Sequence, residues 1–140
     1  MEYRKSGSTL VVRFEDGEEL VSSFTKLCSS ERITGGVVTA IGAVRDAEIS
    51  VFNPATKTYA YVTVKENCEI VSLAGSASVL DGAPWPHLHI ALARQDFSVV
   101  GGHLKKATVS PTCEMAITLV DRLERKRDAK SGLALLDLKK

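Results

Sequence analysis

Strand-forming segments dominate the chain from Gly36 onward, and this pattern limits the possible folds more than any other feature. Stretches rich in Val, Ile and alternating apolar residues occupy 36–52, 58–64, 66–80, 87–94, 97–104 and 113–120. A further strand-forming stretch, residues 9–14, precedes them. Only one segment of the sequence has apolar residues at helical spacing. The sequence therefore predicts an α+β fold: a single compact domain with a curved, mainly antiparallel β-sheet of about seven or eight strands and one long helix near the N-terminus.

The predicted helix spans residues 18–30. Asp16 is the expected N-cap, and Glu18 and Glu19 then lie in the first turn, where carboxylates suit the positive end of the helix dipole. Gly35 marks the end of the segment. The apolar residues of the segment recur at helical spacing and predict one buried face, which consists of Leu20, Val21, Phe24, Leu27 and Cys28.

Length and composition indicate one ordinary globular domain over residues 1–140. Lys and Arg total 18 against 17 Asp and Glu, so the net charge of +1 gives no whole-chain basic excess for nucleic-acid binding. The cysteines are an odd, widely spaced set without a CxxC pair, which favours free thiols in a reducing compartment. No signal-peptide pattern and no apolar stretch of the ~20 residues that span a bilayer is present. We expect a cytoplasmic protein with no membrane partner.

Residues 121–140 form a tail that differs in composition from the rest of the predicted domain. We favour a solvated strand end or hairpin for its basic cluster, with weak contact to DNA phosphates as the alternative. The apolar segment after the cluster needs cover for Leu133, Leu135 and Leu136, from a sheet edge of the same chain or from a neighbouring subunit. The basic residues of the tail that could contact DNA are Arg122, Arg125, Lys126, Arg127 and Lys130.

All three histidines of the chain fall within a short stretch of sequence. His87 and His89 are two residues apart in a predicted strand, so their side chains project from the same face. Two glycines precede His103 and allow a close backbone approach, which brings this ring beside the pair if the two strands run antiparallel. Three imidazoles at one place predict a divalent-metal site, with Zn²⁺ as the expected cofactor and an open fourth position.

The alternative to a metal site is a group of partly buried, hydrogen-bonded histidines. Trp85 stands between two prolines just before the histidine strand, where it either roofs a pocket or subunit contact or packs within its own loop. No GxSxG elbow or P-loop is present, so neither a serine nucleophile nor a phosphate cradle is predicted. The residues that could support the metal ligands from behind are Cys68, Glu69, Cys113 and Glu114.

Four segments, ENCEIVSLAGSAS, PHLHIALAR, GGHL and TCEMAITL, resemble the PPC (plants and prokaryotes conserved) domain family, and the resemblance covers nearly the whole chain. The resemblance implies a compact α+β fold that assembles as a homotrimer. Plant members are joined to AT-hooks and bind AT-rich DNA, whereas stand-alone prokaryotic members carry a DNA-binding label, and some members with this histidine pattern look like zinc proteins. This chain has no Arg-Gly-Arg-Pro core and therefore no AT-hook to enter a minor groove.

These observations together predict a stand-alone PPC-domain protein. It would be a DNA-binding or regulatory homotrimer that carries a zinc site made of His87, His89 and His103. The main alternative is a metal-dependent enzyme or a small-ligand-binding protein that uses the open position of the same site. A cupin ranks last, because residues 91–93 lack the Glu expected after the HxH motif.

Overall fold

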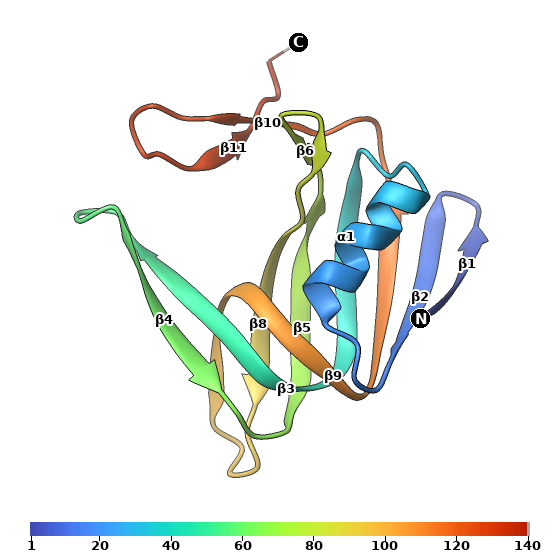
Figure 1. Cartoon of the computed structure of the whole chain (residues 1–140), viewed down its shortest axis with the longest axis vertical. Helices are drawn as coiled ribbons and strands as arrows, with labels where there is room; N and C mark the ends of the chain where they lie inside the picture. Colours follow the sequence, from blue (N-terminus) through green and yellow to red (C-terminus); the bar gives the residue numbers. More distant parts are fainter. Residues whose placement is uncertain (140) are drawn as a thin grey trace.

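Seven strands form one antiparallel sheet in the computed structural model, which describes residues 1–139 (Figure 1). Their order across the sheet is β1-β2-β9-β8-β5-β3-β4. With one helix packed on this sheet, the described chain confirms the predicted α+β class and the single compact domain. The strands are β1 (Glu2–Ser6), β2 (Thr9–Glu15), β3 (Gly36–Asn53), β4 (Thr58–Val64), β5 (Cys68–Ala77), β8 (His87–Ala93) and β9 (Val99–Leu119).

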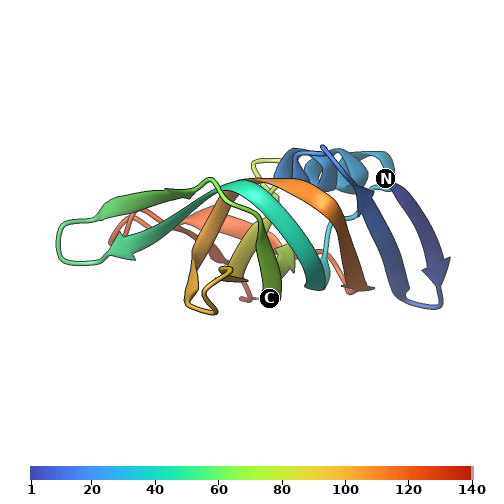
Figure 2. The same cartoon turned by 90° about the horizontal axis from the view of Figure 1, so that it is seen from below.

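Strands β3 and β9 curl the sheet because each is long enough to pair on both edges. β3 pairs with β5 and β4 along one edge and with β9 along the other, while β9 also pairs with β2 and β8. Since β5 also pairs with β8, the strands β3, β5, β8 and β9 close into a ring. Figure 2 shows the resulting arch of the sheet. The ring places the histidine strand β8 directly beside β9.

Helix α1 (Leu20–Ser30) begins two residues later than the sequence predicts. Its N-cap is Glu19, whose carboxylate accepts hydrogen bonds from the backbone N–H groups of Val21 and Ser22. The predicted cap, Asp16, precedes a turn at Gly17 and instead pairs with Arg45, with 3.1 Å between Oδ1 and Nη1. The prediction of the cap was therefore wrong, because the chain turns once more before the helix starts.

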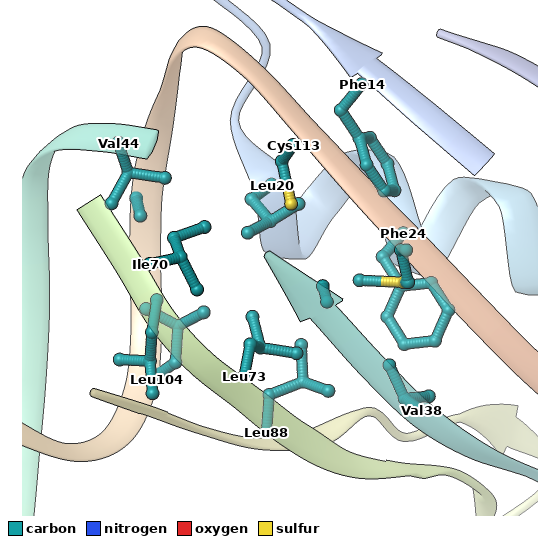
Figure 3. Packing of buried hydrophobic residues seen from close by; sticks show 14 of the residues in the cluster. Phe14, Leu20, Phe24, Val38, Val44, Ile70, Leu73, Leu88, Leu104 and Cys113 are labelled. Carbon is teal, nitrogen blue, oxygen red and sulfur yellow. The ribbon is translucent and has the colours of Figure 1, made fainter. Parts of the chain in front are cut away.

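The core lies between α1 and one face of the large sheet, where Phe14 and Phe24 are fully buried (Figure 3). The helix contributes Leu20, Phe24, Leu27 and Cys28 to this core, as predicted, while Val21 is only partly buried. On β8, the residues between and after the histidines point into the core; they are Leu88, Ile90 and Leu92. The histidine side chains therefore project from the opposite face of the sheet.

The C-terminal tail builds a second, smaller sheet. Its order is β11-β10-β6-β7, made of β6 (Val79–Leu80), β7 (Ala83–Pro84), β10 (Glu124–Arg127) and β11 (Ala134–Leu136). β10 runs parallel to β6 and forms an antiparallel hairpin with β11 (Figure 1). Leu133 is half-buried by this arrangement, whereas Leu135 and Leu136 are exposed. None of the helices in residues 1–139 is long and apolar enough to span a membrane.

Two strands differ from the pattern predicted by the sequence. β1 was not predicted, because its residues EYRKS carry no apolar alternation and are all exposed at the edge of the sheet. The segments 97–104 and 113–120 were expected as separate strands, yet they are the two ends of β9. The polar stretch between them stays in the sheet because it continues to pair with β3 across register shifts.

Candidate metal centre

Strand pairing brings the three histidines together on the sheet face opposite the core. His89 lies directly across from His103 in the antiparallel pair of β8 and β9, as the sequence predicts. On its other side, His89 lies across from Ala74 of β5, and His87 lies across from Ser76. Cross-strand partners project from the same face, so the three rings point to one side of the ring of strands.

The three imidazoles are close enough to share one ion. One ligand nitrogen from each ring lies within 4.8 Å of the others. The ring centroids are 5.2 Å apart for His87 and His89, 5.1 Å for His87 and His103, and 5.6 Å for His89 and His103. His87 and His103 are half-buried and His89 is exposed, so the cluster opens to the outside on one side.

Glycines set the backbone spacing beneath the cluster. A Cβ on Gly75 of β5 would lie 2.0 Å from the carbonyl oxygen of His87, and a Cβ on Gly102 would lie 2.6 Å from the carbonyl oxygen of Ser50. Real side chains cannot approach that closely, so both positions require glycine. The close approach that the sequence predicted for the glycines before His103 is thus present, and it holds β9 against β3.

Arg125 of β10 contacts the histidine cluster at His87. Its Nη2 lies 3.2 Å from Nδ1 of His87, and because a guanidinium can only donate, His87 accepts through this nitrogen. The same Nη2 also donates to Ser76 Oγ at 3.1 Å, while Nε donates to Ser78 Oγ at 2.8 Å and Nη1 to the carbonyl oxygen of Ala134 at 2.7 Å. Arg125 thus forms hydrogen bonds to the large sheet, through Ser76 and His87, and to β11 of the small sheet, through Ala134.

The electrostatics of the cluster favour neutral rings at His87 and His103. Burial, the charge of Arg125 and the other two histidines, in that order, together lower the pKa of His87 to about 4. Burial and then His89 lower the pKa of His103. Neutral imidazole is the form that binds metal ions. The lowered pKa values therefore keep metal-binding lone pairs available near neutral pH.

The cluster lies in the wall of a cavity of about 560 Å³. Its lining includes residues of the β3–β4 hairpin and of the β10–β11 hairpin, and both hairpins are on the left of Figure 1. Trp85 is one of its lining residues, so it faces a pocket as one of the two sequence hypotheses predicted. The other lining residues are Ser50, Val51, Phe52, Tyr59, His87, His89, Gly102, His103, Arg125, Leu133, Ala134 and Leu135.

The four residues predicted to contact the metal ligands from the surrounding protein do not line the cavity that contains the histidines. Cys68 and Cys113 are buried in the core, and Glu69 and Glu114 do not belong to the cavity lining among the described residues. Their positions in the sequence could not show this, because strand pairing decides which residues meet. Arg125 and Ser76 surround His87 instead, and no sequence motif singled them out for this role.

The predicted basic cluster of the tail is divided by the fold. Arg125 is buried, with 6% of its surface exposed, so the expectation that it faces DNA was wrong for this residue. Arg122 pairs with Glu124 at 3.0 Å, and Lys126 pairs with Asp137. Arg127 and Lys130 are exposed, and no ion pair involves them within residues 1–139. The cluster therefore offers less free positive charge than its sequence suggests.

Comparison with known proteins agrees with this architecture. A model of the Plants and Prokaryotes Conserved (PCC) domain matches residues 1–121. The chain belongs to this family. The match confirms the family resemblance seen in the sequence, since PPC and PCC denote the same domain. The matched part of the PCC domain includes α1, the large sheet and all three histidines, whereas β10 and β11 lie beyond it.

Solved structures with the same fold include three proteins that are 31–32% identical to this PCC domain. A candidate DNA-binding protein from Bacteroides thetaiotaomicron has 31% identity and a TM-score of 0.93, covering 97% of this chain and 96% of that one. A plant- and prokaryote-conserved (PPC) protein from Pyrococcus horikoshii has 31% identity and a TM-score of 0.86, covering 99% and 95%. A metal-containing protein from Archaeoglobus fulgidus has 32% identity and a TM-score of 0.86, covering 96% of each chain. No curated protein matches the sequence.

Proposed function

We propose that His87, His89 and His103 hold one divalent metal ion, with Zn²⁺ as the expected ion, and that this centre is the functional site of the PCC domain. The observation that carries the proposal is the convergence of three ligand nitrogens within 4.8 Å. The likeness to a metal-containing archaeal protein over 96% of the chain supports it. Three neutral nitrogen donors suit Zn²⁺, which binds imidazole at ~2.0–2.1 Å.

Metal binding requires a change at His87. A neutral imidazole has one lone pair on its ring nitrogens, and Arg125 uses that lone pair through Nδ1. His87 therefore offers its lone pair either to Arg125 or to a metal ion. We infer that Arg125 gives up this hydrogen bond when the metal binds, while Ser76, Ser78 and the Ala134 carbonyl keep holding the guanidinium.

Bound zinc would supply a Lewis acid with a position left for a small molecule. The chain itself supplies a largely apolar and aromatic wall, oriented imidazoles and a buried guanidinium. Ligand binding at this centre is the function that the cavity supports best, and a metal-dependent reaction on the bound ligand is its extension.

Elemental analysis tests the metal proposal. Protein prepared without chelator, supplied with zinc and freed of excess ion should contain one zinc per chain. His89→Ala should lose this zinc, yet its unfolding free energy in the metal-free state should change by less than about 1 kcal/mol, because His89 is exposed. Retention of stoichiometric zinc by His89→Ala, or absence of zinc in the wild type, would contradict the proposal.

DNA binding is the second candidate function, favoured by the family likeness to a candidate DNA-binding protein. We propose weak, sequence-tolerant contact with phosphates, through Arg127 and Lys130 above all, with Arg122 and Lys126 limited by their acidic partners. Fluorescence anisotropy should give dissociation constants weaker than ~1 µM at physiological salt, rising steeply with added salt. The double variant Arg127→Gln/Lys130→Gln should bind more weakly. Tight, sequence-selective binding would contradict this interpretation.

We further propose a cytoplasmic homotrimer. Free, buried cysteines at all three positions suit a reducing compartment. On the sheet face opposite α1, Val11, Val37, Ile41 and Val71 are exposed, which is an apolar surface that another copy of the chain can cover.

Sedimentation equilibrium tests the assembly. The wild type should sediment with three chain masses at micromolar concentration, and Ile41→Glu should sediment as a monomer because it places a charge in the proposed interface. Phe97→Glu serves as the matched control, since Phe97 is exposed in the β8–β9 turn and is not one of these four strand residues. A stable wild-type monomer would contradict the trimer.

A further inference from the structure

The side chain of Arg125 is a buried cation that has no anionic partner among residues 1–139. It is 6% exposed, and every acceptor that it contacts within residues 1–139 is neutral: two serine hydroxyls, a backbone carbonyl and an imidazole. A buried charge is costly unless an opposite charge accompanies it. The guanidinium also lines the cavity that contains the three histidines. An anionic ligand in that cavity could therefore supply the counter-charge that Arg125 lacks.

The cavity has the electrostatic character of an anion site. Its ionisable lining groups are Arg125, the three histidines and the phenol of Tyr59, so its fixed charge at neutral pH is positive. A divalent ion held by three neutral imidazoles would add two further positive charges. The remaining walls are largely apolar or aromatic, with Phe52, Tyr59, Trp85 and Leu135 among them. Such walls suit the carbon skeleton of a small organic molecule.

We infer that this cavity binds a small organic carboxylate, whose carboxylate group pairs with Arg125 beside the histidine cluster and whose apolar part packs on the aromatic wall. The inference rests on the proposed metal function and names its ligand class. Arginine suits this role because its planar guanidinium forms strong charge-assisted bonds to carboxylates.

Metal and carboxylate should assist each other. The Nη2 group of Arg125 donates to His87 in the described structure, and metal binding at His87 frees this donor for the ligand. Because binding free energies are linked, a metal that tightens carboxylate binding is itself bound more tightly when the carboxylate is present. Carboxylate affinity should therefore be higher in the zinc-loaded protein than in the metal-free protein.

The only tryptophan of the chain provides the measurement, because Trp85 lines the cavity. Benzoate, as the probe carboxylate, should change the Trp85 fluorescence of the zinc-loaded wild type in a saturable way. Benzamide has the same shape without the charge and should bind at least tenfold more weakly. A probe response equal for benzoate and benzamide would overturn the inference, and this comparison needs no variant.

Variants then assign the effect to the guanidinium. Arg125→Gln should weaken benzoate binding at least about tenfold, while Arg125→Lys, which keeps the charge, should weaken it less. Arg4→Gln is the matched control, since Arg4 is an exposed arginine of β1 outside the cavity lining, and it should bind benzoate like the wild type. Unchanged affinity in a folded Arg125→Gln protein would overturn the inference.

Zinc content, measured on each sample, separates the two proposals. A wild type without zinc contradicts the metal proposal, whereas a wild type with stoichiometric zinc and no saturable benzoate response contradicts only the carboxylate inference. Circular dichroism and thermal unfolding show which Arg125 variants are folded. If neither variant folds, the decision rests on benzoate against benzamide in the wild type, with and without zinc.

Discussion

The two faces of the large sheet use the same strands for different purposes. On β8, Leu88 and Ile90 point toward α1 and are buried, whereas His87 and His89 point away from it. The first face is packed with apolar side chains, and the second carries a cavity, a cluster of imidazoles and a buried cation. Neighbouring residues of one strand thus belong to the core and to the candidate site in turn. Substitutions on the core face should lower stability, whereas substitutions on the other face should change ligand binding.

The largest expected effect lies on the helix-covered face. Phe24 is fully buried between α1 and the sheet (Figure 3), so Phe24→Ala leaves a cavity in the core. We expect a loss of about 3–5 kcal/mol in unfolding free energy, measured by urea denaturation. The fraction that remains folded should still bind one zinc. Equal stability of Phe24→Ala and wild type would show that the core is not where the structure places it.

A smaller effect is expected where the two faces share backbone. Gly102→Ala forces a Cβ against the carbonyl oxygen of Ser50, so β9 must move away from β3 next to His103. We expect a stability loss of about 1–3 kcal/mol and a weaker zinc affinity in chelator competition.

Gly7→Ala is the control for the glycine substitution. Gly7 has open space around it and a φ of +59°, so alanine strains only the β1–β2 turn. The control should lose about 1 kcal/mol and keep the zinc affinity of the wild type. If Gly102→Ala also kept the zinc affinity of the wild type, Gly102 would be needed for the fold but not for the geometry of the histidine cluster.

The smallest effect concerns the cysteines on the core face. Burial raises the pKa of Cys28 and of Cys113 to about 12, and burial also raises the pKa of Cys68. At pH 8 the native protein should therefore react with a thiol reagent far more slowly than the protein in urea. Native labelling at the unfolded rate would contradict the burial of these thiols.

The same shifts predict the sign of an alkaline effect. Above the ordinary thiol pKa of 9.0, the unfolded chain loses protons that the folded chain retains until about pH 12. The unfolding free energy should therefore decline as pH rises through this window.

Local patterns explain which parts of the fold and of the histidine cluster the sequence could predict. The period of two in β8 and the glycines before His103 are local features, and they predicted the shared face and the close approach of the three histidines. The helical spacing of apolar residues likewise predicted α1 and its buried face. It did not decide between the two acidic residues Asp16 and Glu19 as the N-cap.

Long-range pairing explains what the sequence could not predict. Arg125 stands among basic residues and has the local pattern of an exposed strand, yet the parallel pairing of β10 with β6, far away in sequence, buries it against Ser78. The cavity likewise depends on two hairpins, β3–β4 and β10–β11, that meet only in the folded chain. The proposed ligand class therefore rests on the structure, whereas the proposed metal site was already predicted from the sequence.

X-ray absorption at the zinc edge tests the central claim, a metal held by the three histidines, most directly. The spectrum of the zinc-loaded wild type should show imidazole nitrogen scattering from about three ligands at ~2.0–2.1 Å, with one or more oxygen scatterers completing the shell. His89→Ala should lose this signature. A wild-type spectrum with sulfur ligands, or with oxygen ligands alone, would contradict the assignment of His87, His89 and His103 as the metal centre.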